Sequence, residues 1–146
     1  MRKLFFLTLV LFTAAFFSQS VKAQSEAQRI ELCTKAAGDC TFLSSYPVQL
    51  GAAKTGERPP TTKQATILKK GNQYRFTICT DEESSGEAVL EVYDEAKKIG
   101  STLVEGKTYQ SFNFDCNKTA HYVITFSFRD GKEGSAVGIL SHVKTL

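Results

Sequence analysis

The sequence lacks several features that would point to a catalytic or metal-binding protein. It has no tryptophan, one methionine and two histidines among its 146 residues. It has no C-x-x-C pair, and neither His121 nor His142 stands at ligand spacing from a cysteine, which argues against a zinc site. It also has no G-x-S-x-G nucleophile elbow. We therefore predict no catalytic residue, no metal ligand and no cofactor, with a hydrolase site assembled from distant residues as the alternative.

The chain also lacks an apolar run of membrane-spanning length. Its longest run, Leu4–Phe17, has 14 residues, whereas a spanning helix needs about 20. Two basic residues precede the run, and residues 21–23 (VKA) have the small-x-small form of a signal-peptidase site. These features predict a signal peptide over residues 1–23, cleavage after Ala23, and export to the periplasm or out of the cell. The next residue is Gln24, so the cysteine that a lipoprotein would need there is missing.

The chain that would remain after cleavage has no net charge. Residues 1–23 contain three of the 18 basic residues and none of the 15 acidic residues, which leaves 15 of each. Without a Lys/Arg cluster, this chain has no positive surface for nucleic acid or for an anionic membrane. We therefore expect neither as a partner. The remaining length fits one domain with a core of its own.

All four cysteines lie after the predicted cleavage site. An even number of cysteines in an exported chain indicates disulfides, and four cysteines allow three connectivities. We predict the pairs Cys33–Cys40, which would close a short loop, and Cys79–Cys116, which lie at the ends of two predicted strands. Because Cys79 is out of phase with the apolar residues of its strand, the second bridge would need a bulge or twist there.

Residues 24–50 are predicted to form an N-terminal arm. Residues 25–37 have apolar residues at helical spacing, with a capping-box pattern at the start and Gly38 as the stop. Residues 41–50 have the composition of an extended segment, and Pro47 restricts that segment to the edge of a sheet.

Residues 51–62 contain two glycines and a Pro-Pro pair, which predicts a linker or long loop. Beyond it, short runs of alternating apolar and polar residues are separated by turn-like residues. The predicted strands are 63–69, 73–79, 87–93, 98–104, 107–115, 120–128 and 135–142. Since each has one apolar face, they predict an all-β, antiparallel, jelly-roll-like sandwich of two sheets over residues 63–146, preceded by the short helical arm.

The same alternation predicts which side chains point into the core. The expected inward set is Tyr74, Phe76, Ile78, Ala88, Leu90, Val92, Ile99, Ser101, Leu103, Phe112, Phe114, Cys116, Tyr122, Ile124, Phe126, Phe128, Val137 and Ile139.

The strand sequences also resemble a known family. The similar segments are residues 71–78 (GNQYRFTI), 88–94 (AVLEVYD), 99–101 (IGS) and 120–124 (AHYVI). They resemble bacterial pre-peptidase C-terminal domains, which are small jelly-roll-like sandwiches attached to secreted enzymes, and they are similar to small exported proteins of Bacteroidetes. This resemblance implies an accessory binding module. Some members of the family bind calcium at an acidic linker, but residues 51–62 carry only Glu57 as an acid.

The acidic loop 80–86 (TDEESSG) is the best candidate site for a hard cation, because Asp81, Glu82 and Glu83 supply carboxylate oxygens. It lacks the D-x-D-x-D-G order of a calcium loop. A solvated hairpin connection is therefore the preferred interpretation.

Two tyrosines, Tyr93 and Tyr109, fall on the outward phase of their strands and are the predicted binding residues. We predict an exported, non-catalytic binding or interaction module of the bacterial cell envelope, whose partner is an envelope protein or glycan. A small secreted hydrolase or inhibitor with a cryptic site and a structural envelope protein are the alternatives.

Overall fold

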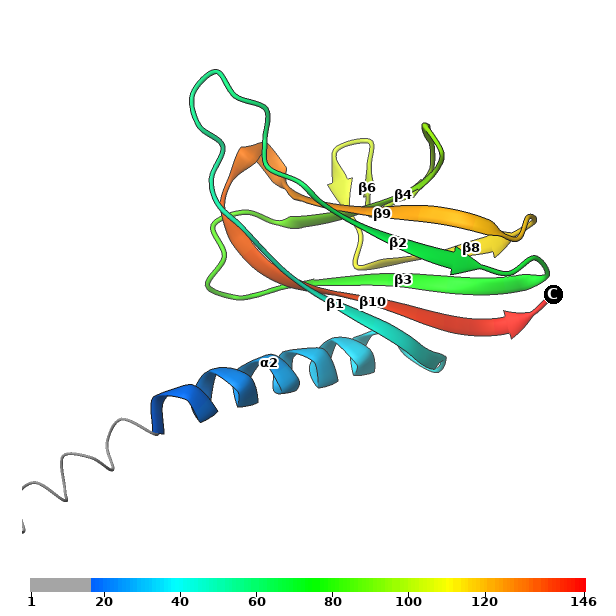
Figure 1. Ribbon diagram of the computed structural model, residues 1–146, viewed down its shortest axis with the longest axis horizontal. Helices are drawn as coiled ribbons and strands as arrows, with labels where there is room; N and C mark the ends of the chain where they lie inside the picture. Colours follow the sequence, from blue (N-terminus) through cyan, green and yellow to red (C-terminus); the bar gives the residue numbers. More distant parts are fainter. Residues whose placement is uncertain (1–16) are drawn as a thin grey trace, which may run out of the picture.

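The computed structural model describes the backbone of residues 17–146 and the side chains of residues 25–146. Its elements in chain order (Figure 1) are α2 (Phe17–Ala36), β1 (Thr41–Leu50), β2 (Thr62–Leu68), β3 (Asn72–Thr80), β4 (Ala88–Asp94), β5 (Lys97–Ser101), β6 (Leu103–Val104), β7 (Lys107–Thr108), β8 (Ser111–Cys116), β9 (Ala120–Phe128), the short 3-10 helix η1 (Arg129–Gly131) and β10 (Gly134–Thr145). Most of the predicted signal peptide, residues 1–23, lies outside the described residues. Within the described part, no helix combines the length and apolar character needed to cross a membrane.

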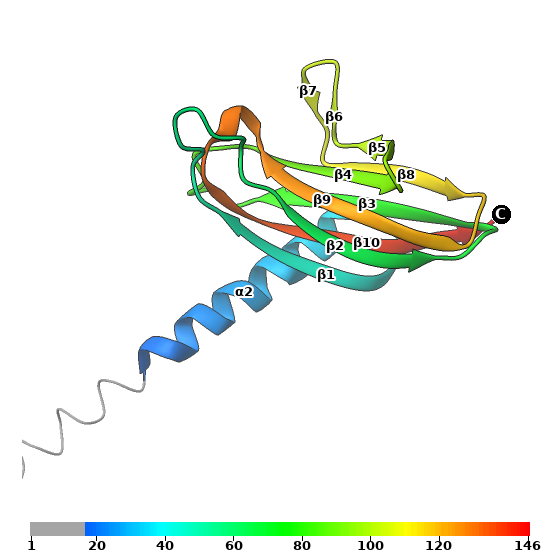
Figure 2. The same ribbon diagram turned by 45° about the horizontal axis from the view of Figure 1, so that its top comes forward.

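Eight strands form two antiparallel sheets of four strands each. Sheet A has the order β1-β10-β3-β8, and sheet B has the order β2-β9-β4-β5. The remaining strands, β6 and β7, pair only with each other. The two sheets face each other in both views (Figures 1 and 2). The predicted fold class, an all-β antiparallel two-sheet sandwich with a short N-terminal helix, is confirmed.

The core lies between the sheets and is formed by the alternate apolar residues of each strand. On β9, Tyr122, Ile124, Phe126 and Phe128 are all buried, as the two-residue period predicted. The other members of the expected set that are buried between the two sheets are Tyr74, Phe76, Ile78, Ala88, Leu90, Val92 and Cys116. The packed rings include Phe76 on Phe112, which stack with centroids 5.4 Å apart.

Strand β1 is part of the sandwich and not of a separate arm. It pairs with β10 from Thr41 to Leu50, and it has no second neighbour in sheet A. The edge position predicted from Pro47 is therefore confirmed. The predicted boundary that left residues 24–50 outside the sandwich is wrong, because the last ten residues of that segment form a strand that pairs with β10.

Helix α2 covers the outer face of sheet A, where it contacts β10, β1 and β3. A second apolar cluster lies between them and contains Cys33, Ala37, Val137 and Ile139. The prediction that Val137 and Ile139 point into the sandwich is therefore wrong. Both faces of β10 are buried, so alternation along β10 does not distinguish the sandwich interior from the helix side.

The start of the predicted helix is also wrong, whereas its end is confirmed. Helix α2 begins at Phe17, so Ser25 lies inside the helix and does not cap it. The helix stops at Gly38, which has a φ of 82° and donates its N–H to the Lys35 carbonyl at 3.1 Å. Arg75 of β3 donates to the Ala37 carbonyl at 2.8 Å and so places a positive charge at the helix C-terminus.

The predicted strands 98–104 and 107–115 are each interrupted. Strands β5 and β6 are separated by Thr102, and β7 and β8 are separated by Tyr109 and Gln110. The chain leaves sheet B at Thr102, forms the β6–β7 hairpin and enters sheet A at β8. Figure 2 shows this hairpin projecting from the sandwich. We call residues 102–110 the projecting hairpin.

Candidate functional site

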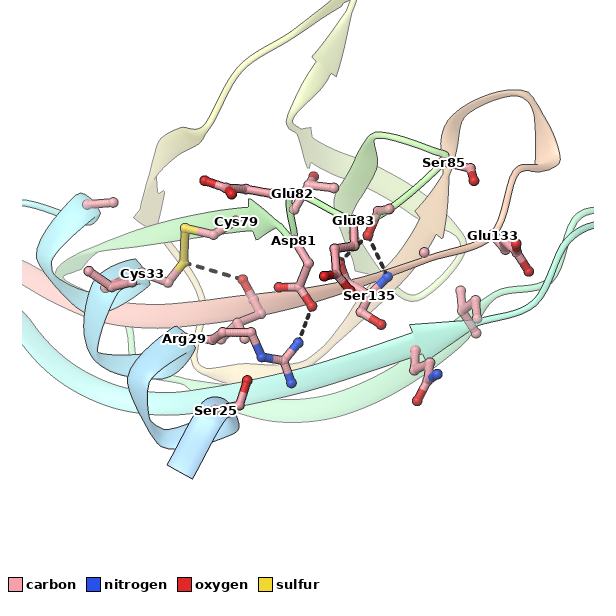
Figure 3. Close-up of a pocket in the computed structure, with 18 of the residues that line it drawn as sticks. Ser25, Arg29, Cys33, Cys79, Asp81, Glu82, Glu83, Ser85, Glu133 and Ser135 are labelled. Atoms are coloured by element: carbon pink, nitrogen blue, oxygen red, sulfur yellow. Dashed lines mark hydrogen bonds and ion pairs between the residues drawn. A yellow bond between two sulfur atoms is a disulfide. The ribbon is translucent and has the colours of Figure 1, made fainter. Parts of the chain in front are cut away.

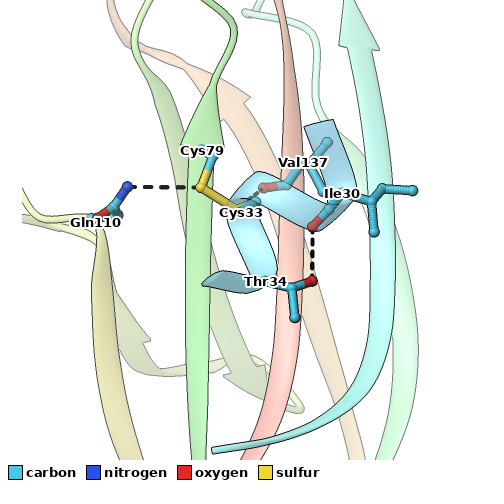
Figure 4. The surroundings of a disulfide bond; sticks show 6 residues. All are labelled: Ile30, Cys33, Thr34, Cys79, Gln110 and Val137. Carbon is cyan, nitrogen blue, oxygen red and sulfur yellow. Dashed lines mark hydrogen bonds between the residues drawn. A yellow bond between two sulfur atoms is a disulfide. The ribbon is translucent and has the colours of Figure 1, made fainter. Parts of the chain in front are cut away.

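The disulfide joins helix α2 to the sheet that it covers. Cys33 of α2 is bonded to Cys79 of β3 (Figure 4), and Cys40 and Cys116 are unpaired in the described part of the chain. The predicted pairs Cys33–Cys40 and Cys79–Cys116 are both wrong. The phase of Cys79 explains why: its side chain points to the outer face of sheet A, toward α2, whereas Cys116 points into the core on the opposite face.

A groove of about 820 Å³ lies beside this disulfide (Figure 3). One wall is α2, and the others are the loop between β3 and β4 and the first residues of β10. Arg29 on α2 forms an ion pair with Asp81 across the groove. The groove is also lined by three glutamates, Glu82, Glu83 and Glu133.

The β3–β4 loop in this groove is held by backbone contacts. The Ser84 hydroxyl donates to the Ser135 carbonyl at 2.9 Å and accepts the Ser135 N–H at 2.9 Å. The Asp81 N–H donates to the same carbonyl at 2.9 Å. The loop joins β3 of sheet A to β4 of sheet B, so the predicted hairpin connection is wrong. No cluster of three or more potential metal ligands occurs among the described residues.

The groove does not contain the residues of a hydrolase site. His142 lies 3.1 Å from Asn72 at the start of β3, whereas the groove lies at the other end of that strand. His121 is exposed and pairs with Ile67 in sheet B. Neither histidine therefore meets a nucleophile or a carboxylate in the groove.

The base of the projecting hairpin is fixed by Thr102. This residue is fully buried, and its N–H donates to the Leu90 carbonyl at 2.9 Å. Its side-chain oxygen accepts the Leu90 N–H at 2.9 Å, and its carbonyl accepts the Tyr109 N–H at 2.7 Å. One threonine thus continues the pairing with β4 and closes the hairpin. The Gln110 carbonyl accepts the Ile78 N–H at 2.8 Å and connects the hairpin to β3.

The side of the hairpin is held by a polar group at the start of β4. The Thr108 hydroxyl donates to the Glu87 carboxylate at 3.0 Å, and Arg129 donates to Thr108 at 3.3 Å. At the tip, Glu105 and Gly106 have positive φ values of 50° and 77°, which form a tight two-residue turn. The hairpin is thus bonded at its base and along one side.

The hairpin exposes two apolar side chains, one next to its tip and one at its base. Val104 is 48% exposed and Tyr109 is 52% exposed. Tyr109 also lines a smaller hollow of about 300 Å³. This hollow shares Cys79, Thr80 and Gln110 with the α2 groove, so the two hollows are neighbours around the end of β3.

The two tyrosines predicted as binding residues lie on different elements of the structure. Tyr109 is on the projecting hairpin, whereas Tyr93 lies on the outer face of sheet B, in one row with Val123 and Ala65. Tyr93 is five residues along β4 from Ala88, which lines the smaller hollow, and that spacing corresponds to about 17 Å. Tyr93 therefore lies outside the hollow that Tyr109 lines.

The surroundings of Tyr93 are polar. Its hydroxyl donates to the Glu91 carboxylate at 2.9 Å, and the same carboxylate binds Lys98 at 2.8 Å. Partial burial, followed by the hydrogen bond to Glu91, raises the pKa of the Tyr93 phenol. The hydrogen bond to Glu91 raises the pKa of the Lys98 ammonium. Tyr93 is thus held against the sheet, whereas Tyr109 is not.

Sequence reasoning missed Val104 as part of a candidate binding surface, and it missed Thr102 as the buried residue that fixes the base of the hairpin. The turn at Glu105 and Gly106 is visible in the sequence, because glycine follows an acidic residue between two apolar runs. The burial of Thr102 depends on a contact with β4, twelve residues earlier in the chain, and no local signal reveals that contact.

Comparison with known proteins gives no family assignment. No family model matches the chain, and no curated protein matches it. In structure, the chain is similar to the crystal structure of Aeromonas hydrophila PliG, a periplasmic lysozyme inhibitor of g-type lysozyme. The TM-score is 0.47 and the sequence identity is 14%, over 73% of this chain and 90% of that chain. A likeness of this size carries no argument about function, which has to be inferred from the described residues.

Proposed function

We propose that the protein is an exported, non-catalytic binding module of the bacterial cell envelope that recognises a partner protein through the projecting hairpin. The observation that carries this proposal is the combination of a bonded base at Thr102 with two exposed apolar side chains on the same hairpin, Val104 next to the tip and Tyr109 at the base. A binding loop that is ordered before it meets its partner loses less conformational entropy on association.

Export is supported by two features of the chain. The basic N-terminal residues and the apolar run Leu4–Phe17 have the pattern of a signal peptide. The Cys33–Cys79 disulfide fits an oxidising compartment such as the periplasm.

A protein partner is favoured over a glycan by the side chains of the hairpin. Sugars bind best on flat aromatic rings, and Tyr109 is the single aromatic residue of the projecting hairpin. Tyrosine is one of the residues enriched at the centres of protein interfaces, and Val104, next to the tip, adds an exposed aliphatic side chain to the same hairpin.

The experiment that tests the proposal is site-specific photo-crosslinking in the cell envelope of the source organism. A photoreactive amino acid replaces Val104 in the full chain, and in a control it replaces Glu95, which is exposed in the β4–β5 turn. We expect one protein adduct at position 104 and none at position 95. Equal labelling from both positions, an adduct that carries only glycan, or no adduct would contradict the proposal.

A further inference from the structure

The two sheets leave four strands with an unpaired edge, namely β1, β2, β5 and β8. Exposed edges can pair with other strands, and proteins commonly protect them. Strand β1 contains Pro47, which has no N–H to offer, and its register shifts between Phe42 and Ser44. Strands β5 and β8 are short, with five and six residues, and both adjoin the projecting hairpin. Three of the four edges are therefore poor templates for a new strand.

Strand β2 is different. It pairs with β9 over all seven residues, Thr62–Leu68, without a register shift. It contains no proline, and Lys63, Gln64, Ala65 and Ile67 are exposed. Ile67 is 58% exposed. Figure 2 shows β2 along the side of its sheet, away from the projecting hairpin. The open edge of β2 is regular over its whole length, and Lys63 is the one charged residue of the strand.

We propose that β2 pairs with β2 of a second copy of this chain, antiparallel and about a two-fold axis at Ala65. Thr62–Leu68 has Ala65 at its centre, so this register pairs the whole strand. It places Lys63 opposite Ile67 of the other copy, and Gln64 opposite Thr66. The aliphatic part of the Lys63 side chain can then lie over the exposed Ile67 side chain of the other copy, and the Lys63 ammonium stays in water.

Charge excludes two other registers. A two-fold axis at Lys63 would place two lysines directly opposite each other, and an axis at Thr66 would place Lys63 opposite Lys69. Like charges directly opposite each other on paired strands are destabilising. The register centred on Ala65 has no such pair. A two-fold axis at Gln64 also avoids a like-charge pair, but it pairs only residues 62–66 of the strand, so strand length and charge together select the register centred on Ala65.

The dimer would join two copies of sheet B into one eight-stranded sheet. In sheet B, β2 is at one edge and β5, which leads into the projecting hairpin, is at the other. The two hairpins would thus lie at opposite ends of the combined sheet, each free to bind a partner. Two projecting hairpins on one dimer increase the apparent affinity for a partner that is itself present in several copies on a surface.

A charge-swap series tests this pairing with protein purified after expression of the full chain. Sedimentation velocity over a range of concentrations measures the dimer dissociation constant of the wild type. Ile67→Lys places a new lysine opposite Lys63 of the other copy, twice in each dimer, and we expect the dissociation constant to rise at least about tenfold. Lys63→Glu combined with Ile67→Lys creates two Glu–Lys pairs and should restore dimerisation.

The matched control is Leu43→Lys, which introduces the same charge at an exposed aliphatic residue of β1 (44% exposed) and should leave the dissociation constant unchanged. Circular dichroism checks that each variant is folded. A wild type that is monomeric throughout, equal effects of Ile67→Lys and Leu43→Lys, or a double variant that stays monomeric would overturn the proposed pairing.

Discussion

Gly138 shows at the scale of one residue how closely the two sheets pack. It lies in β10, and a Cβ atom added there would stand 2.5 Å from the ring of Phe126, which is buried. Because this ring fills the core, it has little room to move. We predict that Gly138→Ala lowers the free energy of unfolding by about 1–3 kcal/mol.

Urea unfolding of the Gly138→Ala variant measures this loss. Gly51→Ala is the control, since nothing lies within 4 Å of a Cβ atom at Gly51. An equal and small effect of both substitutions would contradict the packing described around Gly138.

Tyr122 is the residue for which we predict the largest dependence of folding stability on pH. Burial, followed by the hydrogen bond to Cys116, raises the pKa of its phenol to about 12 from 10. The phenol in the unfolded chain ionises at lower pH than the phenol in the folded chain. The contribution of Tyr122 to the free energy of unfolding is therefore fully present below pH 10 and is lost as the pH rises through 12. We predict that Tyr122 accounts for about 1 kcal/mol of lost stability at pH 11.

The comparison is between the wild type and Tyr122→Phe, with the free energy of unfolding measured at pH 8 and at pH 11. The variant should lose less stability between these two pH values, although it is less stable at pH 8 because the 2.7 Å hydrogen bond from Tyr122 to the Lys118 carbonyl is gone. Parallel losses in both proteins would refute the raised pKa of Tyr122.

Single residues also show what alternation can and cannot predict. It identified the inward residues of β9, because that strand has one apolar face and one polar face. It failed for Val137 and Ile139, since an apolar residue looks the same in the sequence whether a sheet or a helix covers it. The outward phase of Cys79 is visible in the sequence. The helix that meets Cys79 on that side of the sheet is not.

At the scale of elements, the attachment of α2 depends on the disulfide. Cys33 and Cys79 are 46 residues apart, and closing a loop of this length in the unfolded chain corresponds to about 4 kcal/mol in the chain-entropy description. We predict that Cys33→Ser lowers the free energy of unfolding by roughly this amount and increases amide exchange in residues 25–37.

Cys40→Ser is the control for this prediction, because the Cys40 thiol has only weak contacts with backbone carbonyls at 3.5 Å and 3.7 Å. Chemical unfolding and hydrogen exchange of both variants provide the measurements. If Cys33→Ser left the exchange of the helix unchanged, α2 would be held by packing alone.

The projecting hairpin depends on Thr102 in a comparable way. Thr102→Val keeps the shape of the side chain but leaves the buried Leu90 N–H without its acceptor at 2.9 Å. An unsatisfied buried donor costs about 1–3 kcal/mol, and we predict a loss of stability in this range together with faster exchange of the Tyr109 amide.

Thr108→Val serves as the comparison for Thr102→Val, because its hydroxyl bonds Glu87 near the surface and its loss should cost less than about 1 kcal/mol. Equal effects of the two substitutions would mean that the base of the hairpin is not fixed by Thr102.

Element boundaries were predictable where turn residues mark them. Strand β9 was predicted at residues 120–128 and is observed there, because Asn117–Thr119 and Arg129 flank it with polar residues. The strands predicted at 98–104 and 107–115 were too long. Thr102 is compatible with a strand, and its contact with β4, beyond which the chain forms the hairpin, is not local in the sequence.

At the scale of the whole molecule, the two-sheet sandwich was predictable from the number of short alternating strands. The helix that covers one outer face and the disulfide that attaches it were not, since both depend on which elements meet in space. The resemblance to pre-peptidase C-terminal domains stays a prediction. The surface that we propose for binding contains Tyr109, which alternation placed outward, and Val104, which it did not single out.

The most direct test of the binding proposal is the dissociation constant between this protein and the partner identified by crosslinking. Titration calorimetry would compare the wild type with Val104→Lys, Tyr109→Ala and the control Leu43→Lys. The account predicts that both hairpin variants bind at least about tenfold more weakly, whereas Leu43→Lys binds like the wild type. Wild-type affinity in both hairpin variants would contradict recognition through the projecting hairpin.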